Sequence, residues 1–351
     1  MRNRPLAQMA VFGVVASIIG IAIGLSINWF PPQASAQAHE VDTLYNVLIV
    51  ASVPMFVLVV TMVGFSVLKF RMRPGEELKD GPPIHGNTRL EVVWTAIPAV
   101  LLISLASYTY VVLHSFEKKP AGHEMNVDVI GQQFAWSFNY PASVTGGPPM
   151  ASNDLYLPQG EPVRFHITSR DVIHAFYVPA FRLQIDAVPG NPQAVRATPS
   201  RLGDYPLVCA ELCGLGHSAM RTTIHIVTPT AFTAWLKGRR APVTAPGAGP
   251  GQVADAGKAV FTGTGGCGSC HTLADAGTTA QVGPNLSSSL TPDANAHAEA
   301  LGAFIRESIL KPNAYIAKGY PANVMPPNFE STLTPSQIDA LVAYLGKVTA
   351  K

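Results

Sequence analysis

The chain has 351 residues, of which 48% are hydrophobic and only 13% are charged, and its formal net charge is +2 at neutral pH. This length allows two or three domains, and so few charges are unusual for a soluble protein, where charged residues approach about a quarter. The near-neutral balance argues against a nucleic-acid partner and against a strongly acidic one.

The first apolar stretch spans residues 9–30. It follows Arg2 and Arg4 and ends near Ala34-Ser35-Ala36, a small-residue site of the kind at which secretory signals are cleaved. The run is long for the apolar part of a signal peptide. We therefore expect residues 1–36 to be either a signal peptide or a first membrane helix.

Two further apolar stretches, residues 44–68 and 92–113, each reach the roughly 20 residues that cross a bilayer. They predict a transmembrane helical hairpin within residues 37–120. Because the positive-inside rule places basic loops in the cytoplasm, everything after residue 114 should face outward. The basic residues between the two stretches are Lys69, Arg71, Arg73, Lys79 and Arg89.

From about residue 121 to 238 the pattern changes to short β-branched or alternating runs separated by Pro and Gly clusters. Several short strands at this spacing predict an all-β sandwich or barrel. The clearest of these runs are Asn126–Ile130, Pro162–Thr168, Ile173–Val178 and Thr222–Val227.

The densest group of metal-binding side chains lies near the end of this domain, in Cys209-Ala-Glu-Leu-Cys213-Gly-Leu-Gly-His217-Ser-Ala-Met220. Two thiolates, an imidazole and a thioether are soft ligands, which suit copper. Two sulfur atoms can bridge two metal ions, and each copper then needs a nitrogen ligand. His217 supplies one, and His174 is the best upstream candidate because it lies where a strand gives way to a proline-marked turn.

A structural zinc site made by Cys209, Cys213, His217 and one more histidine is the main alternative. Zinc has little use for the thioether of Met220, so the full spacing favours copper. Three other histidines of this domain are interpreted as ordinary strand or surface residues: His123, His166 and His225.

The cysteine segment resembles the binuclear copper site, CuA, of cytochrome c oxidase subunit II, and the similarity covers roughly residues 40–237. Glu91-Val-Val-Trp94-Thr-Ala-Ile-Pro98 resembles the start of that family's second membrane helix. Gly131-Gln-Gln-Phe-Ala-Trp136 resembles its aromatic strand, and Asp186-Ala-Val-Pro-Gly190 resembles one of its loops. The resemblance implies a cupredoxin-like sandwich.

By this resemblance Cys209 and Cys213 bridge two copper ions, while His174 and His217 cap them. Met220 is then a weak axial ligand.

The resemblance also assigns roles outside these side chains. The backbone carbonyl of Glu211 completes the other copper, and its carboxylate faces a magnesium ion shared with subunit I. Glu91 lies near the cytoplasmic mouth of a proton pathway in subunit I. Phe134 and Trp136 are the expected electron-transfer aromatics. In many members an exposed Trp at the position of Phe134 receives electrons from a soluble cytochrome c, and its absence here predicts a different route.

A C-terminal domain, residues 253–351, follows a Pro/Gly-rich linker at residues 239–252. It contains Cys267-Gly-Ser-Cys270-His271, the attachment signature of a c-type haem. The two thiols add to the haem vinyl groups, and the adjacent His271 is placed to bind the iron.

The sixth iron ligand is chosen by elimination, because Met325 is the only methionine after the linker and His297 the only other histidine. Met325 lies in a turn-rich segment before two prolines, whereas His297 lies on an expected solvated helix face. We predict Met325, and His/Met ligation raises the haem potential. The domain resembles class I cytochrome c, an all-α fold in which Gly283-Pro284 would steady the proximal histidine.

These features predict a multidomain membrane protein that acts as subunit II of a haem–copper cytochrome c oxidase. Electrons would pass from an external cytochrome c or a respiratory reductase to the haem c, then to CuA, and then to subunit I, where oxygen is reduced and protons are pumped. Expected partners are subunit I, subunit III and membrane lipid. The copper and haem domains should lie on the outer face of a bacterial cell membrane.

Other classes fit less well. A quinol oxidase subunit II lacks the copper ligands, and an enzyme like nitrous-oxide reductase needs a large extra catalytic domain. A membrane-anchored copper and haem carrier serving another terminal reductase stays open as the alternative. Glu91 favours a partner, because an ionisable residue at a membrane span usually faces protein.

Overall fold

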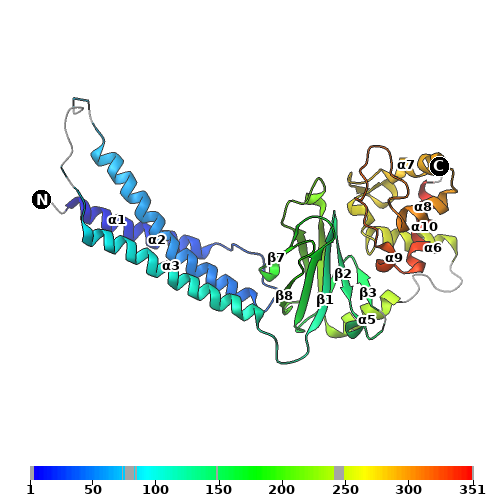
Figure 1. The fold of residues 1–351 in the computed structure, drawn as a ribbon, viewed down its shortest axis with the longest axis horizontal. Coiled ribbons are helices and arrows are strands. Elements are labelled where there is room, and N and C mark those ends of the chain that lie inside the picture. The colour runs from blue at the N-terminus through cyan, green and yellow to red at the C-terminus, as the bar shows by residue number, and fades with distance from the viewer. Residues whose placement is uncertain are drawn as a thin grey trace. The chain divides into compact units, whose positions relative to one another are not determined.

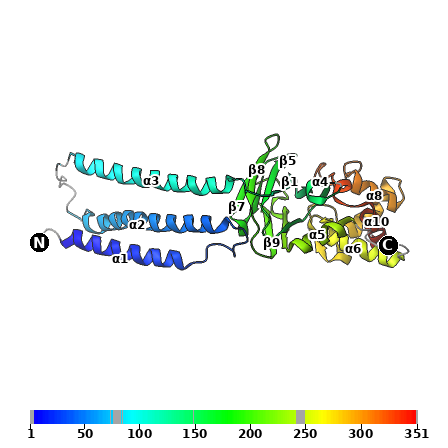
Figure 2. The same ribbon diagram turned by 90° about the horizontal axis from the view of Figure 1, so that it is seen from below.

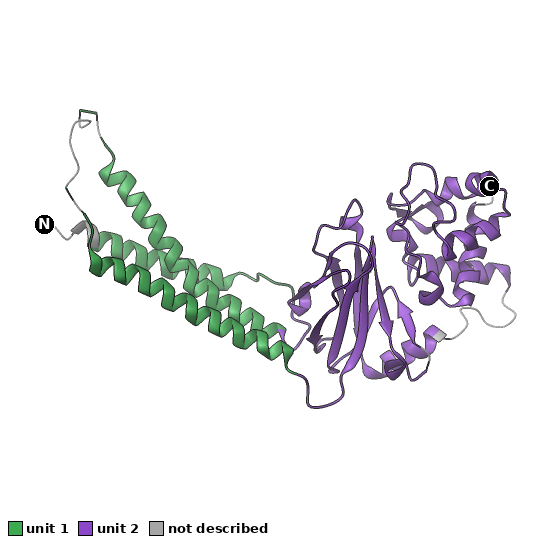
Figure 3. Ribbon diagram, viewed as in Figure 1, with its two compact units in different colours: residues 1–31, 38–118 green, residues 32–37, 119–351 purple. Residues whose placement is uncertain are grey.

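The computed structural model describes residues 4–72, 74–75, 83, 85–147, 149–240 and 249–349. They form two compact units, residues 1–31 with 38–118 and residues 32–37 with 119–351 (Figure 3). Unit 1 is helical, and unit 2 contains a β-sandwich followed by a helical domain (Figure 1). Four parts of the predictions lie outside the described residues: Arg2 before the first apolar stretch, Arg73 and Lys79 of the basic connection, and residues 241–248 of the expected linker.

In its described part, unit 1 consists of α1 (Arg4–Ser26), α2 (Ala38–Phe70) and α3 (Thr88–Glu117). Each helix is long and apolar enough to cross a membrane, and most of its large apolar side chains are exposed, as lipid-facing surfaces require. The helices lie side by side with α2 in the middle (Figure 2). The expected hairpin corresponds to α2 and α3, and the first apolar stretch forms a third helix next to it.

The contact of α1 with α2 is made close by two glycines one helical turn apart. A Cβ atom on Gly20 would lie 2.8 Å from the Val53 side chain, and one on Gly24 would lie 2.8 Å from Ile49. Small residues at this spacing let membrane helices approach each other closely. Helix α1 therefore packs closely against α2 and belongs to the helical unit.

Unit 2 begins with two five-stranded sheets, in the orders β3-β2-β1-β5-β8 and β4-β10-β9-β6-β7. Every second residue of β5 is buried, because one face of each sheet packs against the other. The expected all-β sandwich is confirmed. Its strands are β1 (Met125–Gln132), β2 (Ala135–Tyr140), β3 (Met150–Ser152), β4 (Leu155–Pro158), β5 (Val163–Ser169), β6 (His174–Val178), β7 (Leu183–Ala187), β8 (Gln193–Ala197), β9 (Gly203–Cys209) and β10 (Arg221–Val227), with short helix α4 (Ala142–Thr145) and helix α5 (Pro229–Arg240).

The segment between α1 and α2 belongs to the sandwich. The Ala34 N–H donates to the Ala180 carbonyl at 2.9 Å, and the Ser200 N–H donates to the Ala34 carbonyl at 2.9 Å. Ala34 and Ser35 are only 0% and 3% exposed. The small residues that are typical of a signal cleavage site are therefore built into the folded domain.

The C-terminal domain is mainly helical, as expected. Helices α6 and α10 cross at Gly257, where an added Cβ would lie 2.0 Å from the Ala340 carbonyl oxygen. The rings of Phe261 and Tyr344 meet beside this crossing at 6.1 Å between centroids. The elements are α6 (Pro250–Thr262), β11 (Thr272–Leu273), β12 (Thr278–Thr279), α7 (Leu286–Ala296), α8 (Leu301–Leu310), α9 (Phe329–Thr332) and α10 (Pro335–Thr349).

Candidate copper and haem sites

The side chains predicted to bind copper converge at one end of the sandwich. The sulfur atoms of Cys209 and Cys213 lie 3.8 Å apart, and both cysteines are free thiols. Cys209 Sγ lies 3.9 Å from His174 Nδ1, and Cys213 Sγ lies 3.5 Å from His217 Nδ1. Met220 Sδ lies 3.8 Å from Cys213 Sγ. Two sulfur atoms, two imidazole nitrogens and a thioether thus surround one small volume.

Strand pairing explains how residues far apart in the sequence meet here. Strand β9 ends at Cys209, and β6 begins at His174 and pairs with β9 so that Phe176 lies opposite Cys209. The loop after β9 returns to β10, and the Cys209 N–H donates to the Met220 carbonyl at 3.0 Å. The sheet therefore sets the distance between the first histidine and the cysteine loop.

Asp171 orients His174, and sequence reasoning did not single it out. Asp171 Oδ1 lies 2.8 Å from His174 Nε2, which leaves Nδ1 directed at Cys209. Burial raises the pKa of Asp171, but hydrogen bonds from the Gln133 N–H and the His174 ring outweigh burial, so the pKa is lowered. A carboxylate behind a ligand histidine fixes its ring and tautomer. The spacing of three residues between the two side chains is the signal that could have revealed this role.

The two thiols differ in acidity. Burial raises the pKa of Cys209, but hydrogen bonds with His174 and with nearby backbone groups outweigh burial and lower that pKa to about 6. Burial, together with the negative charge of Cys209, raises the pKa of Cys213 to about 12. The pair therefore shares one proton near neutral pH, and binding a metal ion would release it.

The donor chemistry fits copper better than zinc. A structural zinc site would use the cysteines and histidines and leave the thioether without a role. Met220 is 1% exposed and directed into the cluster, as a soft ligand for copper should be. The Glu211 carbonyl oxygen lies 3.2 Å from Cys209 Sγ, so it too is within the group of possible donors. The exposed Glu211 carboxylate joins no cluster of possible ligands in the described part of the chain, so the structure lends the expected magnesium ion no support.

The two predicted electron-transfer aromatics lie next to this cluster. Trp136 is 2% exposed, and its ring meets the His174 ring edge-on at 6.0 Å between centroids. Phe134 is 8% exposed and covers the turn at Gly216, where an added Cβ would lie 2.4 Å from its ring. Phe134 is therefore a packed side chain rather than an exposed aromatic.

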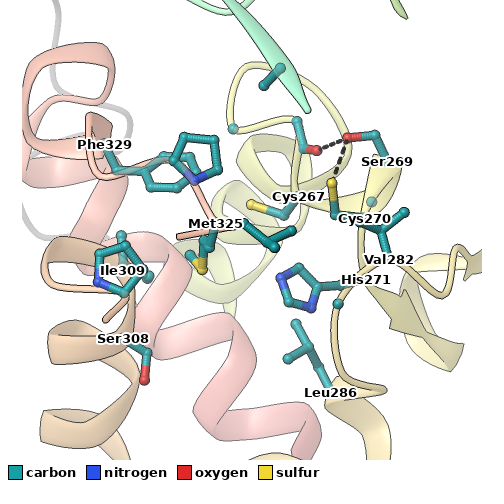
Figure 4. Close-up of a pocket in the computed structure, with 18 of the residues that line it drawn as sticks. Cys267, Ser269, Cys270, His271, Val282, Leu286, Ser308, Ile309, Met325 and Phe329 are labelled. Atoms are coloured by element: carbon teal, nitrogen blue, oxygen red, sulfur yellow. Dashed lines mark hydrogen bonds between the residues drawn. The ribbon is translucent and has the colours of Figure 1, made fainter. Parts of the chain in front are cut away.

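The C-terminal domain contains a cavity of about 420 Å³, which extends to Phe134 and Trp136 of the sandwich. Its lining is largely apolar, as a cofactor cavity requires. Figure 4 shows His271, Met325 and the two cysteines of the attachment motif around this space. The four residues predicted to hold the haem therefore line one cavity, although Met325 comes from a separate segment of the chain.

His271 is held by the backbone of the loop before α7. Its Nδ1 lies 3.0 Å from the Pro284 carbonyl oxygen, which confirms the expected bond and leaves Nε2 for the iron. Burial lowers the pKa of His271, and this keeps the ring neutral as a metal ligand must be. A Cβ on Gly283 would lie 2.5 Å from His271 Cε1, so a glycine is needed for this close approach.

The structure separates the two candidates for the sixth iron ligand. Met325 lines the cavity, whereas His297 is not among its lining residues. The His297 ring instead meets Tyr315 at 5.3 Å between centroids, and its Nε2 lies 3.4 Å from Glu307 Oε2. This arrangement favours Met325.

Glu91 has a structural role at the start of α3. Its Oε1 accepts a hydrogen bond from the Asn87 N–H at 3.2 Å, while the Asn87 side chain accepts one from the Leu90 N–H at 3.2 Å. Such reciprocal bonds satisfy N–H groups that a helix start leaves unpaired.

The membrane helices, the copper donor set and the haem cavity together define a membrane-anchored electron-transport protein with copper and haem c centres. Three family models agree with this class. "Cytochrome C oxidase subunit II, transmembrane domain" matches residues 21–112, "Cytochrome C oxidase subunit II, periplasmic domain" matches residues 150–227, and "Cytochrome c" matches residues 254–349.

Curated relatives support the same assignment over most of the chain. The chain is 34% identical to cytochrome c oxidase subunit 2 of Thermostichus vulcanus over 286 residues, which is 67% of this chain and 85% of the relative. It is 31% identical to cytochrome c oxidase subunit 2 of Alkalihalophilus pseudofirmus over 327 residues, 90% of this chain and 88% of the relative. The solved periplasmic domain of cytochrome oxidase subunit II from Bradyrhizobium japonicum is 30% identical, covers 32% of this chain and 91% of that domain, and has a TM-score of 0.31. The chain belongs to the cytochrome c oxidase subunit II family, and it is a membrane component of a haem–copper oxidoreductase complex.

Proposed function

We propose that this chain accepts electrons for an aerobic respiratory cytochrome c oxidase. An external cytochrome c or respiratory reductase gives one electron to its haem c, and the electron passes to the binuclear copper centre and on to haem in subunit I. There oxygen is reduced to water and protons are pumped. The observation that carries the proposal is that one compact unit holds the predicted donor set for two coppers and a cavity suited to a haem, and that this cavity extends to Trp136, whose ring meets the ring of His174.

When bound, the copper pair would store and release one electron at a time. The thiolates of Cys209 and Cys213 and the imidazoles of His174 and His217 would hold the two ions. Asp171 would keep the His174 ring in the orientation that a ligand needs. The remaining donors would be the Met220 thioether and the Glu211 carbonyl.

The haem would be held by thioether bonds to Cys267 and Cys270, and His271 and Met325 would be the side chains that ligate its iron. The Pro284 carbonyl would fix the His271 ring. Ligation by His and Met favours a high reduction potential, which suits a haem that accepts electrons from a respiratory donor.

The surface of the copper loop supports a protein partner. Leu212 is 79% exposed and Leu215 is fully exposed, and they lie on either side of Cys213 in the sequence. Exposed apolar side chains at a redox site favour contact with another protein surface, and we assign this surface to subunit I. Subunit III is a further expected partner. The proton-pathway role of Glu91 belongs to the same proposal.

We infer that both redox domains lie on the outer side of a bacterial cell membrane and that α1 is retained as a first membrane helix. The segment that connects the end of α2 to the start of α3 carries the basic residues Lys69, Arg71 and Arg89, and this supports a cytoplasmic position for it. Cleavage after residue 36 would remove the buried residues Ala34 and Ser35 from the sandwich. Mass spectrometry of the purified chain tests retention, and a mature chain that begins near residue 37 would refute it.

The first experiment is metal and haem analysis of the purified full chain with electron paramagnetic resonance of its oxidised form. The expected result is one covalent haem c and two coppers that share one unpaired electron. His217→Ala should abolish the shared-electron signal, and His225→Ala should keep it, because His225 pairs with Asp204 outside the cluster. A single-copper signal or bound zinc in the native chain would contradict the proposal.

A second measurement separates the oxidase from a carrier that serves another terminal reductase. Membranes that contain the native complex should consume oxygen with reduced haem c as donor, and the chain should purify with a haem–copper subunit. A chain with intact copper and haem signals that purifies with a different reductase would favour the carrier.

A further inference from the structure

A short stretch of the sandwich touches the segment that carries the haem-binding cysteines, and both lie in unit 2. The side-chain Nδ2 of Asn153, one residue after β3, donates to the backbone oxygens of Thr264 and Gly265 at 3.2 and 3.3 Å. Cys267 follows Gly265 after one intervening residue. Asn153 therefore holds the backbone immediately before the haem attachment.

The same stretch is bound to the copper side. The Thr222 hydroxyl lies 3.0 Å from the Asn153 carbonyl oxygen and 2.9 Å from Asp154 Oδ1. Thr222 is two residues after Met220, the proposed thioether ligand. One continuous path of covalent bonds and two hydrogen bonds therefore joins Met220 to Cys267, with Asn153 at its centre.

A second contact fixes the same edge of the sandwich. Arg239, near the end of α5, donates through Nη2 to the Ala151 carbonyl at 3.0 Å and to the Thr332 carbonyl at 2.7 Å. Ala151 is in β3 and Thr332 is in α9 of the haem domain. Arg239 is only 8% exposed, and its Nη2 makes both bonds, while Nε and Nη1 have no hydrogen-bond partner among the described residues. A buried arginine shared by the two domains indicates a defined contact.

We propose that Asn153 is a positioning residue for electron transfer, because its amide holds the haem-attachment segment, through Thr264 and Gly265, against the part of the sandwich that is bonded to the start of β10, next to the proposed copper ligand Met220. The proposal rests on the proposed function, in which the haem c reduces the copper pair. One electron leaves the haem and one reaches the copper pair, and no bond is made or broken and no proton moves. A flexible tether alone raises the local concentration of the haem near the copper pair. A defined contact between the two domains also raises the fraction of molecules in the arrangement that allows electron transfer.

The test uses the purified full chain with both cofactors. Asn153→Asp keeps the side-chain shape but replaces the amide donor with a carboxylate that faces two carbonyl oxygens. The rate of haem-to-copper electron transfer after flash photoreduction should fall by about tenfold, as expected from the loss of two hydrogen bonds. Asn153→Ala should give a smaller fall. Asn295→Asp, the same exchange on the exposed end of α7, is the matched control and should leave the rate unchanged.

Two further readouts distinguish positioning from general damage. Pulsed electron paramagnetic resonance should show a narrow haem–copper distance distribution in the native chain and a broad one in Asn153→Asp. The rate of haem-to-copper electron transfer in that variant should also fall as glycerol raises the viscosity, because the two domains must then diffuse into contact before each transfer. The rate in the native chain should not change with viscosity.

The outcomes separate the two proposals. Native rates and native distance distributions in both Asn153 variants would overturn the positioning role. A native chain in which no electron passes from haem to copper would instead refute the proposed function. In that case the distance distributions still decide whether Asn153 holds the haem-attachment segment.

Discussion

Among the described glycines of the haem domain, Gly257 leaves the least room for an added Cβ, and Gly257→Ala tests this close packing directly. The residue lies in the middle of α6, where this helix crosses α10. An added Cβ would lie 2.0 Å from the Ala340 carbonyl oxygen and 2.6 Å from Tyr344 Cβ, whereas real Cβ contacts are almost never under 3.0 Å. The helices would have to separate by about 1 Å, because the obstacle is backbone that cannot rotate away.

The size of the effect follows from two opposing contributions. Forcing an extra carbon into a packed core costs about 1–3 kcal/mol, and a gap of this size forfeits up to about half of the dispersion energy of the contacts it opens. Alanine in a helix interior gains up to about 1 kcal/mol over glycine. We expect a net loss of about 2 kcal/mol, which corresponds to a fall in Tm of roughly 10 °C for a domain of this size.

The assay is thermal unfolding of the full chain, followed by helical circular dichroism and by haem absorption. Gly346→Ala in α10 is the matched control, because a Cβ there meets nothing within 4 Å and should only gain helix propensity. The two substitutions should therefore shift the Tm in opposite directions. A Gly257→Ala chain as stable as the native protein would refute the close crossing of α6 and α10.

Three other predictions concern the sites. In the copper-free chain the lowered pKa of Cys209 should stabilise the fold most near the ordinary thiol pKa of 9.0, and this contribution should be lost as the pH falls through about 6, while the raised pKa of Cys213 should offset it at higher pH; denaturant unfolding between pH 6 and 9 should show the loss, and Cys209→Ser should remove it. Met325→Ala should lower the haem reduction potential in a redox titration, whereas His297→Ala should leave it unchanged; the reverse pattern would overturn the ligand choice. Gly283→Ala should push the His271 ring out of line and alter the haem spectrum, and a native spectrum would contradict the close approach seen at this loop.

The features that could be predicted from sequence are those encoded over short distances along the chain. The apolar lengths of residues 44–68 and 92–113 predicted membrane helices, since hydrogen bonds within a helix satisfy the backbone without outside help. The donor types at Cys209–Met220 and the haem motif at Cys267–His271 are likewise local. Alternation of apolar residues predicted a sandwich, because that pattern requires only one buried face on each strand.

The first apolar stretch shows where local pattern is insufficient. Its length and the small residues Ala34 and Ser35 fit both a signal peptide and a membrane helix. Only the folded chain shows that these small residues are buried in the sandwich. Only packing shows that Gly20 and Gly24 bring α1 against α2.

The sequence by itself determined which ligands this protein offers, and the tertiary structure decided how they are held. Asp171 orients His174 because β6 pairs with β9, and no local pattern contains that pairing. Phe134 became a packed side chain through contact with a distant turn. Asn153 is hydrogen-bonded to Thr222 on the copper side across 69 residues, and to the haem side across more than a hundred. Such contacts depend on the arrangement of several strands and helices at once, so they exist only when the chain is folded.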